Sequence, residues 1–144
     1  MDSDNPVVRL CAEGMMVEGQ GHGDQARDLF AQAWDQSKND VEACIAAHYL
    51  ARHQGSAEQT LYWNREALRR ADASGDERVG SFYPSLYLNL GRSYELIGDS
   101  AAARRYYDLA AESANNLPAD GYGAMVRRGI GAGQRRVEAR GEPQ

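Results

Sequence analysis

Lysine is almost missing from this chain of 144 residues, because 15 of its 16 basic residues are arginine and only Lys38 is lysine. The formal net charge is -5, and it is unevenly distributed. Residues 1–66 carry 11 acids and 5 bases, whereas residues 67–144 carry 10 acids and 11 bases. Neither part has the concentrated basic face that nucleic-acid binding requires. We therefore expect no nucleic-acid partner, and we interpret the arginine bias as coding composition.

The chain also has no apolar run of the roughly 18–20 residues that a membrane span needs. Its first residues, Met-Asp-Ser-Asp-Asn-Pro, have neither the basic flank nor the apolar core of a secretory signal peptide. The two cysteines, Cys11 and Cys44, are too few for a disulfide scaffold, so we expect both to be reduced. Together these features predict a cytoplasmic protein with no membrane partner.

Recognisable catalytic and metal-binding motifs are lacking as well. Two of the three histidines, His48 and His53, are five residues apart and fall on different sides of a helix, whereas a metal site prefers an i, i+4 pair with further ligands. The run Gly19-Gln-Gly-His-Gly23 has the glycine spacing of a nucleotide-binding loop, but such a loop follows a strand and the preceding segment here has a helical pattern. We expect this run to be a turn, and we expect no metal, no cofactor and no enzymatic activity.

The sequence does contain helix signals throughout, and no segment alternates with a strand period. Pro6 after Asp4-Asn5 marks the start of a first helix that runs to about Gly19. Later helices are predicted from caps and breakers: Asp24 to about Ser37, Asp40 to just before Gly55, Ser56 to about Ala73, Ser81 or Pro84 to Gly98, Ser100 to about Asn116, and Asp120 to about Arg140. The predicted fold class is therefore all-α with about seven helices.

One pattern of large and small residues recurs along these helices. It consists of the segment Tyr87-Leu-Asn-Leu-Gly-Arg-Ser-Tyr94 followed by Gly98, Ala103, Tyr107 and Ala110. A first copy uses Leu10, Gly14, Val17, Gly21, Ala26, Phe30 and Ala33; a degraded second copy uses Cys44, Ala47, His48, Ala51, Gly55, Thr60, Asn64 and Ala67. This spacing resembles the tetratricopeptide repeat, a pair of antiparallel helices in which small residues permit a close crossing.

The resemblance implies a right-handed α-solenoid of three helix hairpins, as in small stand-alone bacterial repeat proteins. Gly14 and His48 are 34 residues apart, which is the repeat length of the family. His48 and Gly91 are 43 apart, so a lengthened polar turn near residues 72–77 is expected. The expected organisation is one domain over residues 1–140, with repeats at about 7–40, 41–74 and 82–117, a capping helix at 120–140 and a frayed tail at 141–144.

The resemblance also implies a place for a ligand, because the first helix of each pair lines the concave face in this family. It implies a non-catalytic scaffold or adaptor that binds a protein or peptide segment in this groove. The lysine and asparagine that clamp chaperone tails in some members are missing, since Cys11 and Met15 occupy their places. The groove residues implied in this way are Cys11, Met15, Glu18, Ile45, Tyr49, Arg52, His53, Leu88, Asn89, Arg92 and Glu95, with Val126, Arg127 and Ile130 from the capping helix.

The second copy departs most from the pattern, because His48 replaces the small crossing residue and Asn64 replaces an aromatic one. Such departures mark either a functional site or simple degeneracy. The first alternative would be a small-molecule site or an atypical enzyme near Cys11, His48 and His53. Another alternative is a homo-oligomer formed through the surface around Trp34 or Trp63. Of Trp63 and its neighbour Tyr62, one is expected to fill the core space that Asn64 leaves and the other to be exposed.

Overall fold

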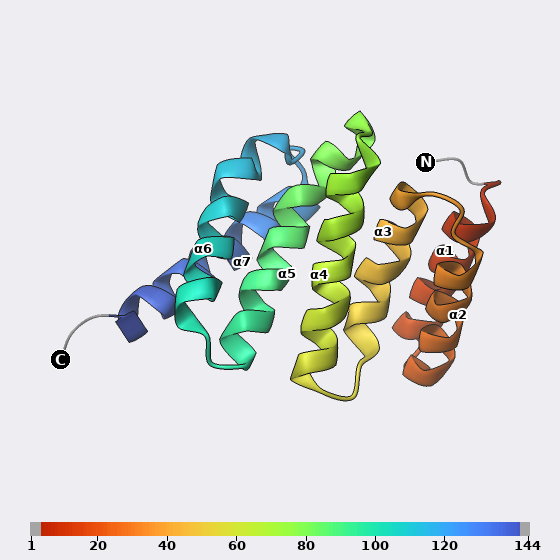
Figure 1. Cartoon of the computed structure of the whole chain (residues 1–144), viewed down its shortest axis with the longest axis horizontal. Coiled ribbons are helices and arrows are strands. Elements are labelled where there is room, and N and C mark those ends of the chain that lie inside the picture. Colours follow the sequence, from red (N-terminus) through yellow and green to blue (C-terminus); the bar gives the residue numbers. More distant parts are fainter. Residues whose placement is uncertain (1–3, 142–144) are drawn as a thin grey trace. The chain divides into compact units, whose positions relative to one another are not determined.

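The structure is a computed structural model that describes residues 4–141 and divides into two compact units, Met1–Asp76 and Glu77–Gln144. The described residues form seven α-helices and three short 3₁₀ segments and contain no strand, which confirms the all-α prediction (Figure 1). None of these helices is both long and apolar enough to cross a bilayer. The elements are α1 (Pro6–Gly19), α2 (Gly23–Gln36), α3 (Asp40–Leu50), η1 (Ala51–His53), α4 (Ala57–Ser74), η2 (Glu77–Phe82), α5 (Tyr83–Leu96), α6 (Ser100–Ser113), η3 (Ala114–Asn116) and α7 (Gly121–Gly141).

Three of the seven predicted helix starts are confirmed by the predicted side-chain cap, and α6 begins at Ser100 as predicted, behind the cap Asp99. The Asn5 side chain accepts hydrogen bonds from the backbone of Val7 and Val8, and Ser56 caps α4 in the same way. Asp120 accepts from the backbone N–H of Gly123 at 2.8 Å and starts α7. Of the tail predicted to fray, Gly141 ends α7 and residues 142–144 lie outside the described residues.

Two predicted caps were wrong by one or two residues. Asp24 lies in the first turn of α2, and the N-cap position is occupied by His22 without a side-chain cap bond. Asp40 is likewise the first residue of α3, because Asn39 accepts from the Glu42 N–H at 2.9 Å and is the cap. Neighbouring Asx residues compete for one cap position, and only the local backbone decides between them.

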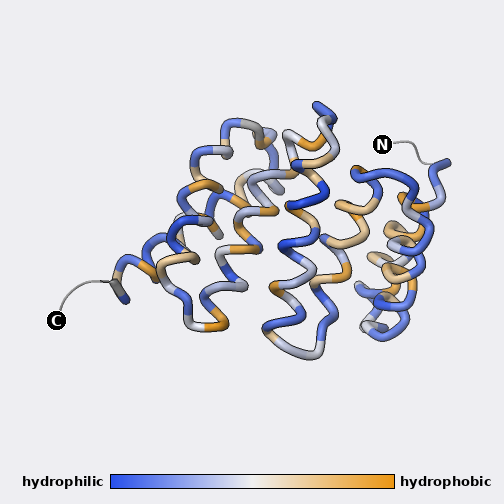
Figure 2. The backbone as a smooth tube through the Cα atoms, in the orientation of Figure 1, coloured by the Kyte–Doolittle hydropathy of each residue, from blue (hydrophilic) through white to orange (hydrophobic). Residues whose placement is uncertain are grey.

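The first unit contains the hairpins α1–α2 and α3–α4, and each helix alternates apolar and polar stretches (Figures 1 and 2). At the crossing of α1 and α2, the Phe30 ring lies directly against Gly14, and a Cβ added at Gly14 would come closer than 3.0 Å to the ring. Gly14 is therefore required for the close approach of these two helices. The glycine run between them is a turn, as predicted, with Gly21 at φ +86°.

The second unit repeats this crossing in the hairpin α5–α6. A Cβ added at Gly91 would lie 2.6 Å from the Tyr107 ring. The same ring also contacts Gly133 of α7, where an added Cβ would overlap it. The long helix α7 therefore packs closely on α6, and its Val126 and Ile130 join Leu88 of α5 in a buried cluster.

The hairpin α3–α4 exchanges large and small residues at the same two positions. His48 stands where the other hairpins have glycine, and the buried Asn64 stands where they have Phe30 or Tyr107. Exchanging the larger residue between the two helices keeps the combined volume near that of the other pairs, which is the kind of change that cores tolerate. The lengthened connection expected near residues 72–77 starts at Gly75, which adopts φ +60° after α4 ends at Ser74, and it includes the 3₁₀ segment η2 before α5.

Candidate functional site

The candidate site in the first unit is formed by residues of α1, α3 and η1. We call it the α1–α3 face, and its residues are Met15, Glu18, Tyr49, Arg52 and His53. Its polar centre is Glu18, near the end of α1. One Glu18 oxygen accepts from Arg52 Nη1 at 3.2 Å, and the other lies 2.5 Å from His53 Nε2. The sequence interpretation named all three residues, and the structure brings them together.

Aromatic rings pack against the residues of this polar centre. Phe30 stacks on Tyr49 with ring centroids 5.1 Å apart and on the His53 ring at 5.8 Å. The Arg52 guanidinium lies over the Tyr49 ring, 5.2 Å from its centroid, in cation–π geometry. Arg52 is thus held by a ring and by one carboxylate. Among residues 4–141 the Arg52 side chain donates a hydrogen bond through Nη1 alone, and its exposed side chain presents further N–H donors to solvent.

Met15 lies one helical turn from Glu18 and adds an apolar element to the face. Its side chain is 44% exposed, which is unusual for a large hydrophobic residue. Met15 precedes Glu18 by three residues, as Tyr49 precedes Arg52, and residues at this spacing share one side of a helix. Because Glu18 and Arg52 are in contact, Met15 and Tyr49 belong to the same side of the paired helices.

The expectation that an open groove is lined by Cys11, Leu88, Val126 and Ile130 was wrong, because these side chains belong to the core. Cys11 is 3% exposed and clusters with Ala46 and Leu50 of α3, whereas Leu88 is 4% exposed and clusters with residues of α7. Both stand three residues before the crossing glycine. In each unit the helix that follows the hairpin packs over the residue at this position. The residue pattern within one repeat does not predict whether a later helix buries it.

In the second unit α7 also contacts two other predicted groove residues of α5, Glu95 and Arg92. Glu95, expected in the groove, accepts from Arg136 at 2.9 Å and Arg140 at 2.8 Å, and its side chain is only 10% exposed. Arg136 of α7 is therefore a structural partner of Glu95. Arg92 is exposed and lies against Gly129 of α7, where an added Cβ would meet its Nη2 at 2.9 Å.

The last three predicted residues have mixed surroundings. Ile45 is half-buried against the core of the first unit. Asn89 is half-buried, and its carbonyl oxygen accepts from the Ser93 hydroxyl at 2.9 Å. Arg127 donates to the carbonyl oxygens of Ala114 and Leu117, both at 3.3 Å, and so fastens the connection before α7.

The residues considered for chemistry are poorly suited to nucleophilic attack. Burial raises the pKa of both Cys11 and Cys44 to about 12, and both thiols are free. A protonated buried thiol is a weak nucleophile. Burial, and secondarily the charge of Arg52, lowers the pKa of His48 to about 4, so its ring is neutral at pH 7. Within residues 4–141 no group of three His, Cys, Asp or Glu side chains is arranged to hold a metal ion.

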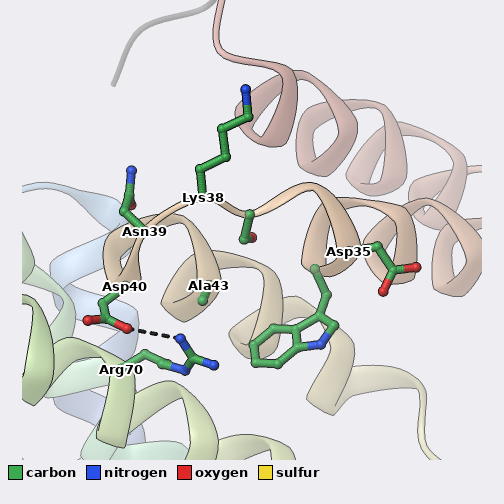
Figure 3. A pocket seen from close by; sticks show the side chains of 8 residues that line it. Asp35, Lys38, Asn39, Asp40, Ala43 and Arg70 are labelled. Carbon is green, nitrogen blue, oxygen red and sulfur yellow. Dashed lines mark hydrogen bonds and ion pairs between the residues drawn. The ribbon is translucent and has the colours of Figure 1, made fainter.

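A pocket that the sequence interpretation missed is lined by residues of α2, α3, α4 and the α2–α3 connection (Figure 3). We call it the Trp34 pocket, and its volume is about 530 Å³. Only Trp34 had been considered, as a surface for self-association. In the structure Trp34 is half-buried and meets Trp63 edge to face at 5.0 Å, while Tyr62 is exposed. The residues that line the Trp34 pocket are Trp34, Asp35, Ser37, Lys38, Asn39, Asp40, Ala43 and Arg70.

No family model, no curated protein and no solved structure matches this chain.

Proposed function

We propose that this chain is a non-catalytic binding module of the tetratricopeptide type, which holds a peptide segment of a protein partner on the α1–α3 face. The observation that carries the proposal is the Arg52 guanidinium, which is fixed over Tyr49 and by Glu18 but keeps exposed donors. A planar guanidinium held in place binds a carboxylate or phosphate by two parallel hydrogen bonds with little loss of entropy.

The exposed Met15 supplies the apolar half of such a site. Its side chain is unbranched and polarisable, so it adapts to different apolar groups of a ligand. A half-buried aromatic ring, an adaptable apolar side chain and one oriented cation are the few anchors from which most interface energy arises. The helix hairpins with glycine–aromatic crossings support the repeat-family assignment.

Affinity capture with a matched pair of variants tests this proposal. The double variant Met15→Ser, Arg52→Gln removes both anchors without touching the core, and Tyr62→Ser, Arg65→Gln removes an exposed apolar residue and an exposed arginine from α4. We expect a partner retained by wild type and by the α4 variant to be lost, at least tenfold, by the α1–α3 variant. Equal capture by all three proteins would refute the α1–α3 face as the binding surface.

A further inference from the structure

The Trp34 pocket is built around an arginine that cannot move freely. Arg70 of α4 donates from Nη1 to Asp40 at 2.9 Å and from Nε to Glu66 at 3.1 Å. Its guanidinium also lies 5.2 Å from the centroid of the Trp34 ring. Figure 3 shows the contact between Arg70 and Asp40 as a dashed line. The pocket therefore has a fixed wall of one guanidinium and one indole, and Ala43 leaves the space beside them open.

The ionised groups of this wall are held in ion pairs with one another and, for Glu66, with Arg69, whereas two charged groups at the margin make no direct ion pair. The Arg70 cation faces the carboxylates of Asp40 and Glu66. The Asp35 carboxylate, in contrast, has no ion-pair or hydrogen-bond partner among residues 4–141. The Lys38 ammonium makes no direct ion pair among these residues; its charge helps to lower the pKa of Glu42, whose carboxylate accepts from the Lys38 backbone N–H at 3.0 Å. In Figure 3 Lys38 and Asp35 extend from different margins of the pocket. The lysine stem has four rotatable bonds and can turn its charge over the opening.

We propose that the Trp34 pocket binds a small zwitterion that carries a flat apolar group, such as a dipeptide ending in an aromatic residue. Lys38 would pair with the ligand carboxylate, Asp35 with its ammonium group, and the flat group would lie against the indole and Arg70. A volume of about 530 Å³ is within the range of small-molecule sites and suits a molecule of this size. This site is separate from the α1–α3 face and does not depend on the function proposed there.

The chain contains its own reporter for this binding event, because its two tryptophans are Trp34 and Trp63 and their rings are in contact. Titration with glycyl-phenylalanine, followed by tryptophan emission excited at wavelengths that phenylalanine does not absorb, is expected to saturate with a Kd on the order of 0.1–1 mM. The same dipeptide with an acetylated amine and an amidated carboxyl group is expected to bind at least tenfold more weakly. Equal binding of the blocked dipeptide, or an unchanged emission up to 10-fold above this range, would overturn the proposal.

Charge variants locate the two ends of the ligand. Lys38→Gln and Asp35→Asn are each expected to raise the Kd at least fivefold, whereas the matched exposed variants Arg27→Gln and Asp28→Asn on α2 leave it unchanged. Backbone amide shifts from Ser37 to Asp40 on titration would support the location. Shifts confined to residues outside the pocket, or equal Kd values for the pocket and control variants, would reject it.

Discussion

The hairpin α1–α2 of the first unit and the hairpin α5–α6 of the second unit use the same residues at the same spacing. Gly14, Glu18 and Phe30 correspond to Gly91, Glu95 and Tyr107, in each case 77 residues later. The turns correspond too. The N–H of His22 donates to Val17 O at 3.0 Å, the N–H of Asp99 donates to Tyr94 O at 2.9 Å, and the glycine before each has a positive φ.

The helix that follows each hairpin is what differs between the units. In the first unit α3 and η1 cover the Phe30 ring with the rings of Tyr49 and His53. In the second unit α7 contacts Tyr107 through Gly133. Side chains thus remain between the following helix and the hairpin in the first unit, and the α1–α3 face retains exposed groups. In the second unit the glycine contact brings α7 onto the hairpin, and Leu88 and Glu95 are covered.

The largest loss of stability is expected at the two crossing glycines, Gly14 and Gly91, where the two hairpins correspond and leave no space for a side chain. Gly91→Ala should destabilise the second unit by about 3–4 kcal/mol, because Tyr107 is held between Gly91 and Gly133 and cannot yield. Gly14→Ala should cost about 2–3 kcal/mol, since Phe30 faces rings that can shift. Amide hydrogen exchange of α5–α7, and urea unfolding followed by tryptophan emission for the first unit, measure the two losses. Gly19→Ala, at a site with open space, is the control and should leave both units within about 1 kcal/mol.

The next effect concerns the hairpin that breaks the pattern. His48 has its pKa lowered to about 4 by burial and by Arg52, so the unfolded chain takes up the proton at higher pH than the folded one. The contribution of the neutral His48 to the free energy of unfolding should be fully present above about pH 6.5. The free energy of unfolding should fall by about 2–3 kcal/mol as the pH drops to about 4. His48→Gln should remove most of this slope in urea unfolding followed by tryptophan emission. A slope that is unchanged in the variant would mean that other groups cause it.

A smaller difference is expected between the corresponding glutamates. Glu95→Gln should cost about 2 kcal/mol, because this carboxylate is 10% exposed and faces two arginines and Tyr107. Glu18 is 28% exposed and pairs with the exposed Arg52 and with His53, so Glu18→Gln should cost less, about 1 kcal/mol. Hydrogen bonding, first of all with Arg136, lowers the pKa of Glu95, and its contribution is therefore present above about pH 4.3 and lost as the pH falls below that value. Equal losses in the two variants, measured as above, would contradict the different cover inferred for the two units.

The smallest change in stability is expected at Gly131 of α7, where an added side chain would displace no packed group. An added Cβ at Gly131 meets only the end of the Arg135 side chain, at 3.4 Å. Gly131→Ala should therefore stabilise α7 by about 0.5–1 kcal/mol through helix propensity. Gly133→Ala, two residues away, should destabilise it instead, and hydrogen exchange of α7 separates the two signs. Loss of stability in both variants would mean that α7 tolerates no added side chain on either side.

Much of the fold was predictable because its signals are local. The helix starts at Asn5, Ser56 and Asp120 depend on one capping side chain and the backbone N–H groups of the next three residues. These groups are neighbours in the sequence, so the sequence alone indicates the cap. The pairing of helices followed from the spacing of small and large residues. The sequence interpretation also selected Glu18, Arg52 and His53, which the structure joins at one carboxylate.

The candidate site was predictable only in the first unit, because exposure depends on what the next helix covers. Cys11, Leu88 and Glu95 fitted the groove pattern, but each is buried or paired by a helix that begins much later in the chain. The Trp34 pocket was missed for the same reason, since Arg70 of α4 and Asp40 of α3 meet there across 30 residues. Local spacing determined the helices and their crossings, whereas long-range packing alone decided which polar groups remained accessible, because accessibility is a property of neighbouring elements and not of a side chain.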